Sequence, residues 1–477
     1  MPGFGWRMFG SAPTSFAMST RYTRRDLLRL TGAGFGMVGL RNLLGEQMAG
    51  PLAPKQPHFP AKAKHIIHLF LNGAPSHVDS FDYKPALEKY HGQPYPGGNL
   101  RTERMTGALM KSPFEFTPQG KSGIPVSEIF PGLGSVIDEC LVINSMHTEV
   151  PFHEPSLFMF NCGQRIAGHP SYGSWLTYGL GTENQNLPGF VVLCPGYPVV
   201  GPQLWSSAYL PGAYQGAYVR NTEVEPEKLV PFLKNSSLGV EEQRQQLELL
   251  GALNRLQLEQ EGPAPELDAA INSMEVAFRM QAEAMDAFDV RLESEQARAR
   301  YGDGDFAHGC LIARRLVERG VRVVQVYYGN MQPWDTHDDV QKMRSLAATS
   351  DKAMAALIQD LRASGLLDET IVVIGGEFGR TPTVEVAGVT KLQAGRDHNN
   401  HGFSALVAGG GFRGGVRYGA TDEFGFKAVE NPVHVHDLHA TMLHQMGLDH
   451  KRLTYRHSGR DFRLTDVEGE VIQGLIA

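Results

Sequence analysis

The segment that most constrains the fold is the uncharged run 371–375, Ile-Val-Val-Ile-Gly, together with the polar stretch after it. A β-branched run that ends at glycine is typical of a strand buried on both faces. Glu377 and Arg380 follow this strand directly, and a loop then carries Asp397, His398 and His401. Strands buried on both faces occur mainly in parallel sheets covered by helices. The segment therefore indicates an open α/β sheet with polar side chains at one edge.

Other short apolar runs have the same character and alternate with helical patterns; they are 65–71, 141–144, 188–194, 321–327 and 403–408. Amphipathic helices are expected at 307–319 and 340–364. This alternation predicts a doubly wound, mostly parallel sheet flanked by helices. The charged stretch 225–300 has helical spacing interrupted by Gly-Pro-Ala-Pro, so we interpret it as a helical insertion. The Gly/Pro-rich stretch 94–130 is expected to be a surface excursion.

Composition excludes several classes of protein. A net charge of −7 over 477 residues indicates neither a nucleic-acid partner nor a membrane-surface protein. The four cysteines show no Cys-x-x-Cys spacing, which favours buried thiols or one or two optional disulfides over a metal site.

The N-terminus resembles an export signal. Arg24 and Arg25 precede a weakly apolar, glycine-rich stretch that is too short to span a bilayer. This layout predicts a twin-arginine signal and linker over residues 1–60, with Met18 a more natural start than Met1, and one folded unit over 61–477. The expected partner is the twin-arginine translocase, and the expected location is periplasmic or extracellular. An ordinary amphipathic first helix is the alternative.

Polar residues follow several of the expected strands. Asn72 ends the run 65–71 and is followed by His77 and Asp79; the pair Asp335 and His337 follows the run 321–327. His153 begins an expected helix after the run 141–144. Such strand ends meet at one rim of an α/β sheet, where imidazole and carboxylate groups suit a divalent metal. Helix capping is the alternative for each residue alone.

A terminal helix is expected to carry several further polar residues, namely His434, His436, Asp437, His439 and His444. Capping and surface roles are the preferred interpretation for these residues.

Several longer runs resemble an uncharacterised exported bacterial family, catalogued as domain of unknown function 1501 and placed in the alkaline phosphatase and sulfatase superfamily. The runs are LNGAPSHVDSFDYKP, residues 310–337, GGEFGRTP, GRDHNNHGFSALVAGGGFRGG, YGATDEFG and GRDFRLTD. The resemblance implies an alkaline-phosphatase-like fold. It also implies hydrolysis of phosphate or sulfate esters that uses one or two metals and a nucleophile at a helix start.

Residue by residue, the resemblance implies a partial site. Asp335, His337 and His401 resemble the cluster that holds one metal, and Glu377 stands where an aspartate holds another. His153 replaces the nucleophilic cysteine of sulfatases. The remaining substitutions at the site are Asn72 for the first-strand aspartate, Phe378 for a histidine, and Leu157 for an arginine.

The sequence is compatible with three functions. The first is an exported metal-dependent hydrolase of small-molecule or glycan esters, with catalytic His153, Asn72 and Arg380. The second is a degenerate binding protein that keeps the metal pocket, and the third is an unrelated activity on the same fold. The expected cofactor is a divalent cation: zinc, calcium or manganese. Four more residues are possible members of the site, namely His77, Asp79, Asp397 and His398.

Overall fold

The computed structural model describes residues 51–98, 102–229, 239, 241–250, 285–386 and 394–477. Residues 1–50 of the expected signal and linker (1–60), and most of the expected helical insertion, lie outside the described residues. Among the described residues, no helix is long and apolar enough to cross a bilayer.

Within the described residues, nine strands form one sheet in the order β13-β5-β12-β9-β1-β8-β6-β7, with β16 pairing to β5. Their bounds are β1 His65–Phe70, β5 Cys140–His147, β6 Phe190–Leu193, β7 Ala217–Val219, β8 Val323–Tyr327, β9 Thr370–Gly375, β12 Phe403–Ala408, β13 Val416–Tyr418 and β16 Val433–His434. All pairings are parallel except those of β12, which runs antiparallel to β9 and β5. The mostly parallel α/β sheet is therefore confirmed.

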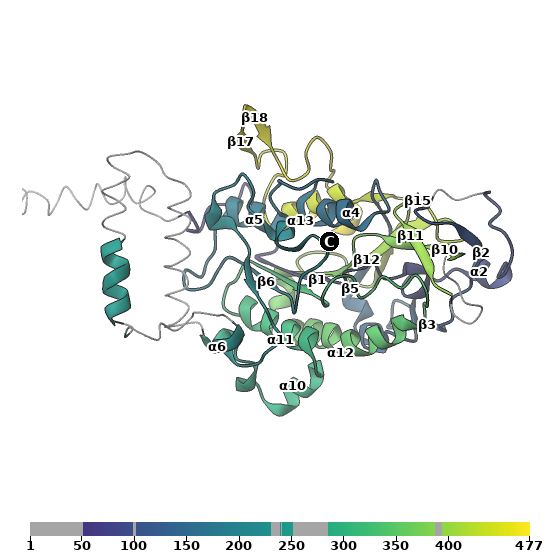
Figure 1. The fold of residues 1–477 in the computed structure, drawn as a ribbon, viewed down its shortest axis with the longest axis horizontal. Coiled ribbons are helices and arrows are strands. Elements are labelled where there is room, and N and C mark those ends of the chain that lie inside the picture. The colour runs from purple at the N-terminus through teal and green to yellow at the C-terminus, as the bar shows by residue number, and fades with distance from the viewer. Residues whose placement is uncertain (1–50, 99–101, 230–238, 240, 251–284, 387–393) are drawn as a thin grey trace, which may run out of the picture. The chain divides into compact units, whose positions relative to one another are not determined.

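Helices cover both faces of this sheet (Figure 1). The helices α11 (Asp305–Val317) and α12 (Lys342–Ala363) pack on one face, where Ile67 and Leu69 of β1 join their apolar core. On the other face Ile66 and Phe70 join α4 (His153–Cys162), α5 (Tyr172–Leu180) and α13 (Val435–Gln445). Both faces of β1 are therefore buried, which explains its apolar residues, and His65 and His68 of the same strand are buried as well.

A small sheet, β11-β10-β2, differs from the expected loops. It consists of β2 (Thr106–Leu109), β10 (Gly379–Glu385) and β11 (Arg396–Asn399), so the polar stretch after β9 contains two paired strands. Inside it, the buried Asp79 and Arg396 pair with Nε to Oδ2 at 2.6 Å. Breaking a buried pair of this kind costs about 3–5 kcal/mol. The pair therefore ties the segment after β1 to β11.

The remaining described elements are peripheral. They are α2 Pro85–Lys89, β3 Phe116–Gln119, β4 Ile124–Ser127, α3 Pro131–Ser135, α6 Pro226–Leu229, α9 Met285–Phe288, α10 Glu295–Tyr301, β14 Ala420–Thr421, β15 Ala428–Glu430, β17 Tyr455–His457 and β18 Arg460–Phe462. The stretch 94–130 is not wholly a surface excursion, because Leu109, Phe114 and Val126 are buried. All four cysteines are buried free thiols, so no disulfide forms.

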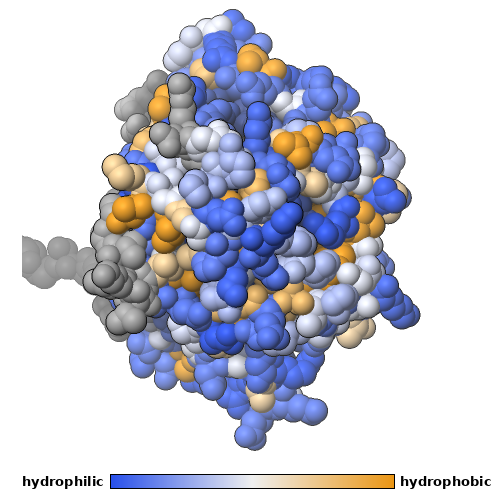
Figure 2. Space-filling view, turned by 90° about the vertical axis from the view of Figure 1, so that its right-hand side faces the viewer, coloured by the Kyte–Doolittle hydropathy of each residue, from blue (hydrophilic) through white to orange (hydrophobic). Residues whose placement is uncertain are grey.

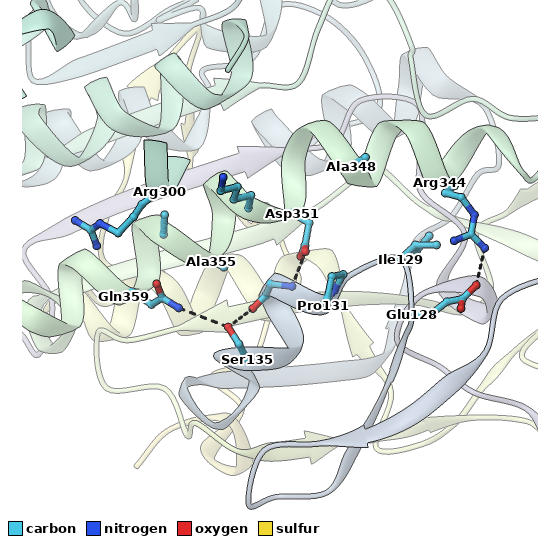
Figure 3. A pocket seen from close by; sticks show the side chains of 13 residues that line it. Glu128, Ile129, Pro131, Ser135, Arg300, Arg344, Ala348, Asp351, Ala355 and Gln359 are labelled. Atoms are coloured by element: carbon cyan, nitrogen blue, oxygen red, sulfur yellow. Dashed lines mark hydrogen bonds and ion pairs between the residues drawn. The ribbon is translucent and has the colours of Figure 1, made fainter. Parts of the chain in front are cut away.

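A groove of about 580 Å³ lies between α12 and the segment 128–135 (Figure 3). At its floor the Asp351 carboxylate accepts hydrogen bonds from the backbone N–H groups of Gly132 and Leu133, at 2.5 and 2.8 Å. Burial raises the pKa of Asp351 to about 6, although the two backbone bonds oppose the shift. The native state therefore holds this proton more tightly than the unfolded chain does.

We expect the Asp351→Asn variant to reveal this proton in the pH dependence of stability. The contribution of Asp351 is greatest below about pH 4, where the carboxyl is protonated in both states, and is lost as pH rises through about 6. The loss should be about 2–3 kcal/mol. Urea unfolding of both proteins from pH 4 to 7 measures it, and a difference between them that does not vary with pH would contradict the assignment.

Candidate metal centre

Three imidazole nitrogens converge on one carboxylate oxygen at the carboxyl-terminal rim of the sheet. The Nε2 atoms of His337, His398 and His153 lie 2.9, 3.2 and 3.3 Å from Asp335 Oδ1. The Nε2 atoms of His337 and His398 are also 2.9 Å apart. Together these four residues form a candidate metal-binding cluster, which we call the rim centre.

The other nitrogen of each ring faces an oxygen acceptor. His153 Nδ1 lies 2.7 Å from Glu377 Oε1, and His337 Nδ1 is bound by Glu385. His398 Nδ1 lies 2.7 Å from the Pro151 carbonyl oxygen and also contacts Glu103. Each Nδ1 therefore donates its proton outward, which leaves the Nε2 lone pair directed at the centre. Acceptors behind metal-bound histidines fix the tautomer and ring orientation in this way.

This arrangement fits a cation. Four lone-pair-bearing atoms that face one point repel one another unless a proton or a metal lies between them. A tetrahedral zinc with bonds of about 2.0–2.2 Å would separate its ligands by about 3.3–3.5 Å, close to the distances at the rim centre. His153 Nε2 is buried and makes no hydrogen bond with a described residue in good geometry. The residues present therefore fit a divalent metal.

The pKa shifts of Asp335 and His153 also favour positive charge at the rim centre. Burial raises the pKa of Asp335, but the surrounding imidazoles and the Arg380 guanidinium outweigh burial and hold the pKa far below its ordinary value. Burial lowers the pKa of His153, but Asp335 and Glu377 outweigh burial and raise the pKa. The surrounding carboxylates thus favour positive charge at the centre, whether a proton or a cation supplies it.

Local structure explains how these residues meet. His153 is the first residue of α4, whose N-terminus lies at the rim. Asp335 lies on the loop after β8, where Trp334 N donates to Asn72 O at 3.1 Å. Gly73 has φ of 108°, and a Cβ there would lie 2.6 Å from Asp335 N. Only glycine therefore permits the loop after β1 to approach the loop after β8 so closely.

The structure places His398, rather than the expected His401, beside Asp335 and His337. His398 pairs with Arg380 across β10 and β11, so both side chains point from the same face of the small sheet toward the rim. His401 follows the end of β11, and its ring packs on Phe426 with centroids 5.1 Å apart. His401 therefore lies outside the rim centre, and His398 takes the place that was expected for it.

Glu377 and Arg380 take supporting places. Glu377, expected as a metal ligand, accepts from His153 Nδ1 and from Gly73 N at 3.0 Å. Arg380, expected to be catalytic, is fully buried, and its Nη2 donates to Asp335 Oδ1 at 2.6 Å. Its Nε donates to Ala74 O at 2.9 Å, and its Nη1 lies 3.4 Å from His337 Nε2. Both residues therefore position ligands.

Asn72 is buried beside the loop after β8. Its Nδ2 donates to Met331 O at 2.6 Å and to Gly329 O at 3.3 Å, whereas Oδ1 has no partner among the described residues. The amide therefore holds the start of the loop that carries Asp335.

The four additional candidates separate into two pairs. His398 joins the centre, and Asp397 lies next to it, within 4.8 Å of ligand atoms on His337 and Glu385. His77 instead binds Gly425 O at 2.7 Å, and Asp79 forms an ion pair with Arg396, so both residues stabilise the fold.

Phe378 stands where the resemblance expected a histidine. Its ring packs on the rings of His153 and His398, with centroids 4.9 and 4.6 Å away.

Sequence reasoning missed Glu385 and Glu103. Glu385 ends β10, and Glu103 lies in the stretch expected to be a surface excursion. Neither follows a strand of the central sheet, which was the signal that located the other members.

We expect His398→Ala to hold less zinc than the wild type and His401→Ala to hold as much. Removing one of four ligands lowers affinity strongly, whereas the His401 ring lies outside the centre. Elemental analysis of both purified variants, after zinc loading and dialysis, measures the difference. Equal zinc content in the two variants would contradict the ligand set.

The chain is similar to several known proteins and matches one family model. Similar solved structures include the PsFucS1 sulfatase from Pseudoalteromonas sp., with 11% identity, 86% of this chain and 70% of that chain covered, and a TM-score of 0.32. A protein in the alkaline phosphatase superfamily from Vibrio parahaemolyticus has 10% identity, coverages of 84% and 70%, and a TM-score of 0.31. The search of curated proteins found no match. The family model described as Protein of unknown function (DUF1501) matches residues 63–476, and the chain therefore belongs to that family.

Proposed function

We propose that this protein is a metal-dependent hydrolase of phosphate or sulfate esters. The observation that carries the proposal is the convergence of three imidazole Nε2 atoms and Asp335 Oδ1 at a rim that solvent reaches. The side chains of Asp335, His153 and His337 are 20%, 11% and 11% exposed. A structural ion is more often enclosed completely, whereas a reacting one needs access.

The ligand set favours zinc among the three expected metals. Imidazole suits zinc, whereas calcium takes six to eight oxygen ligands. When bound, such a cation supplies Lewis acidity toward an ester oxygen and lowers the pKa of a coordinated water.

The chain's own residues then have defined tasks. Glu377 and Glu385 hold the Nδ1 protons of His153 and His337, and so keep the Nε2 lone pairs directed inward. Arg380 holds Asp335 ionised in place. Because Glu377 binds Nδ1 of His153 and Nε2 faces the rim centre, His153 acts as a ligand. The attacking group is therefore water, and direct attack by His153 is disfavoured.

One observation favours a second candidate function, a binding protein without turnover. The rim centre offers four protein ligands, and zinc sites with four protein ligands are usually structural. Catalysis would need access for water or the ester to a cation held by these four residues. The same purified protein can distinguish these alternatives.

We expect the zinc-loaded protein to hydrolyse 4-nitrophenyl phosphate or 4-nitrophenyl sulfate, and His337→Ala to lower the rate at least about a hundredfold through loss of metal. Release of 4-nitrophenol at 405 nm measures the rate, with His401→Ala as the matched control. A protein that holds zinc in the rim centre and turns over neither ester would favour the binding function.

We further propose export by the twin-arginine pathway to the periplasm or beyond, where small-molecule or glycan esters would be the substrates. The support is the sequence pattern of residues 23–40, with Arg24 and Arg25 ahead of a weakly apolar stretch. Folded export would allow the metal to be loaded in the cytoplasm.

The double variant Arg24→Lys, Arg25→Lys should remain in the cytoplasm, because the translocase reads the arginine pair. Cell fractionation with an antibody to the folded part measures the distribution. Unchanged export of the double variant would exclude this route.

A further inference from the structure

A second group of metal-binding side chains lies at the start of α13 and is not part of the rim centre. His434, His436 and Glu468 place one ligand atom each within 4.8 Å of the others. Glu468 Oε2 is 3.3 Å from His436 Nδ1 and 4.0 Å from His434 Nδ1. The sequence suggested only capping and surface roles here, but His436 is 4% exposed.

The tautomer of His436 is fixed by its buried nitrogen. Nε2 lies 2.8 Å from the Gly163 carbonyl oxygen, an acceptor, so Nε2 carries the proton in the neutral ring. Nδ1 is then a lone pair, and it faces the Glu468 carboxylate, which is another acceptor. Two acceptors at 3.3 Å require a proton or a cation between them.

His434 is held in the same way. Its Nε2 lies 3.0 Å from Glu149 Oε1, and its Nδ1 accepts the His436 backbone N–H at 3.1 Å. The ring therefore donates from Nε2 to a carboxylate, as metal-bound histidines often do. Its Nδ1 lone pair caps α13, and because a ring nitrogen has one lone pair, a cation at Nδ1 would displace that capping bond.

The surroundings determine whether a cation is tolerated. The N-terminus of α13 is unfavourable for positive charge, because its backbone N–H groups point outward. Three carboxylates offset this effect of the helix N-terminus, namely those of Glu468, Glu149 and Asp437. Asp437 Oδ2 accepts a hydrogen bond from His434 N at 2.9 Å. Glu468 is 59% exposed, so its side chain can adjust to an ion and leaves a side open to water.

We propose that His434, His436 and Glu468 form a second site for a divalent transition-metal cation such as zinc, with Glu149 orienting His434. Three protein ligands and an open position are the pattern of an accessible zinc site. The proposal does not depend on hydrolysis at the rim centre. The two sites are connected through residues 147–153, which carry Glu149 toward one site and His153 toward the other.

The test is the zinc stoichiometry of the full chain, stripped with chelator, reloaded with zinc and dialysed. We expect about two zinc ions per chain for the wild type and about one for Glu468→Gln or His436→Ala. The rim variant His337→Ala should also hold about one, and the double variant His337→Ala, Glu468→Gln about none.

His444→Ala is the matched control, because His444 lies on the same helix but packs against Phe59, with ring centroids 4.8 Å apart. It should keep both ions. If the buried His436 variant fails to fold, as circular dichroism would show, the zinc content of Glu468→Gln tests the proposal. Unchanged stoichiometry in Glu468→Gln, or only one ion in the wild type that His337→Ala removes, would overturn the proposal.

Discussion

The structure depends on one electrostatic constraint: three imidazole nitrogens lie around a single carboxylate oxygen of Asp335. Glu377, Glu385 and the Pro151 carbonyl each accept a hydrogen bond from an imidazole Nδ1. The Nε2 lone pairs therefore face one another. Such a group is stable only with positive charge at its centre. A divalent cation would supply that charge, and the separations of the four atoms are close to those of tetrahedral coordination.

The fold supplies each part of this group from a different element. Parallel strands β1, β8 and β9 end at the same rim, and α4 begins there after β5. The small sheet adds His398 and Glu385 from outside the central sheet. Arg380 joins these layers, since its buried guanidinium binds Asp335 and carbonyl oxygens of the loop after β1.

The sequence was sufficient for the main strands of the central sheet but not for the short strands β7, β13 and β16. Apolar β-branched runs located β1, β8 and β9, and the residues directly after them include Asp335, His337 and Glu377. The sequence could not separate His398 from His401, because the choice depends on the register of β10 and β11, which shifts between Arg380 and Val384. The sequence also could not show that Glu377 orients His153. The place of a residue after a strand does not tell which imidazole nitrogen its carboxylate contacts.

The most direct test of this account is a crystal structure of the zinc-loaded protein with anomalous data collected on both sides of the zinc absorption edge. The account predicts an anomalous peak enclosed by the Nε2 atoms of His153, His337 and His398 and by Asp335 Oδ1, within about 2.0–2.2 Å of each. It would be contradicted by a zinc-saturated crystal in which no peak lies among these atoms and the three rings bind Asp335 as protonated donors.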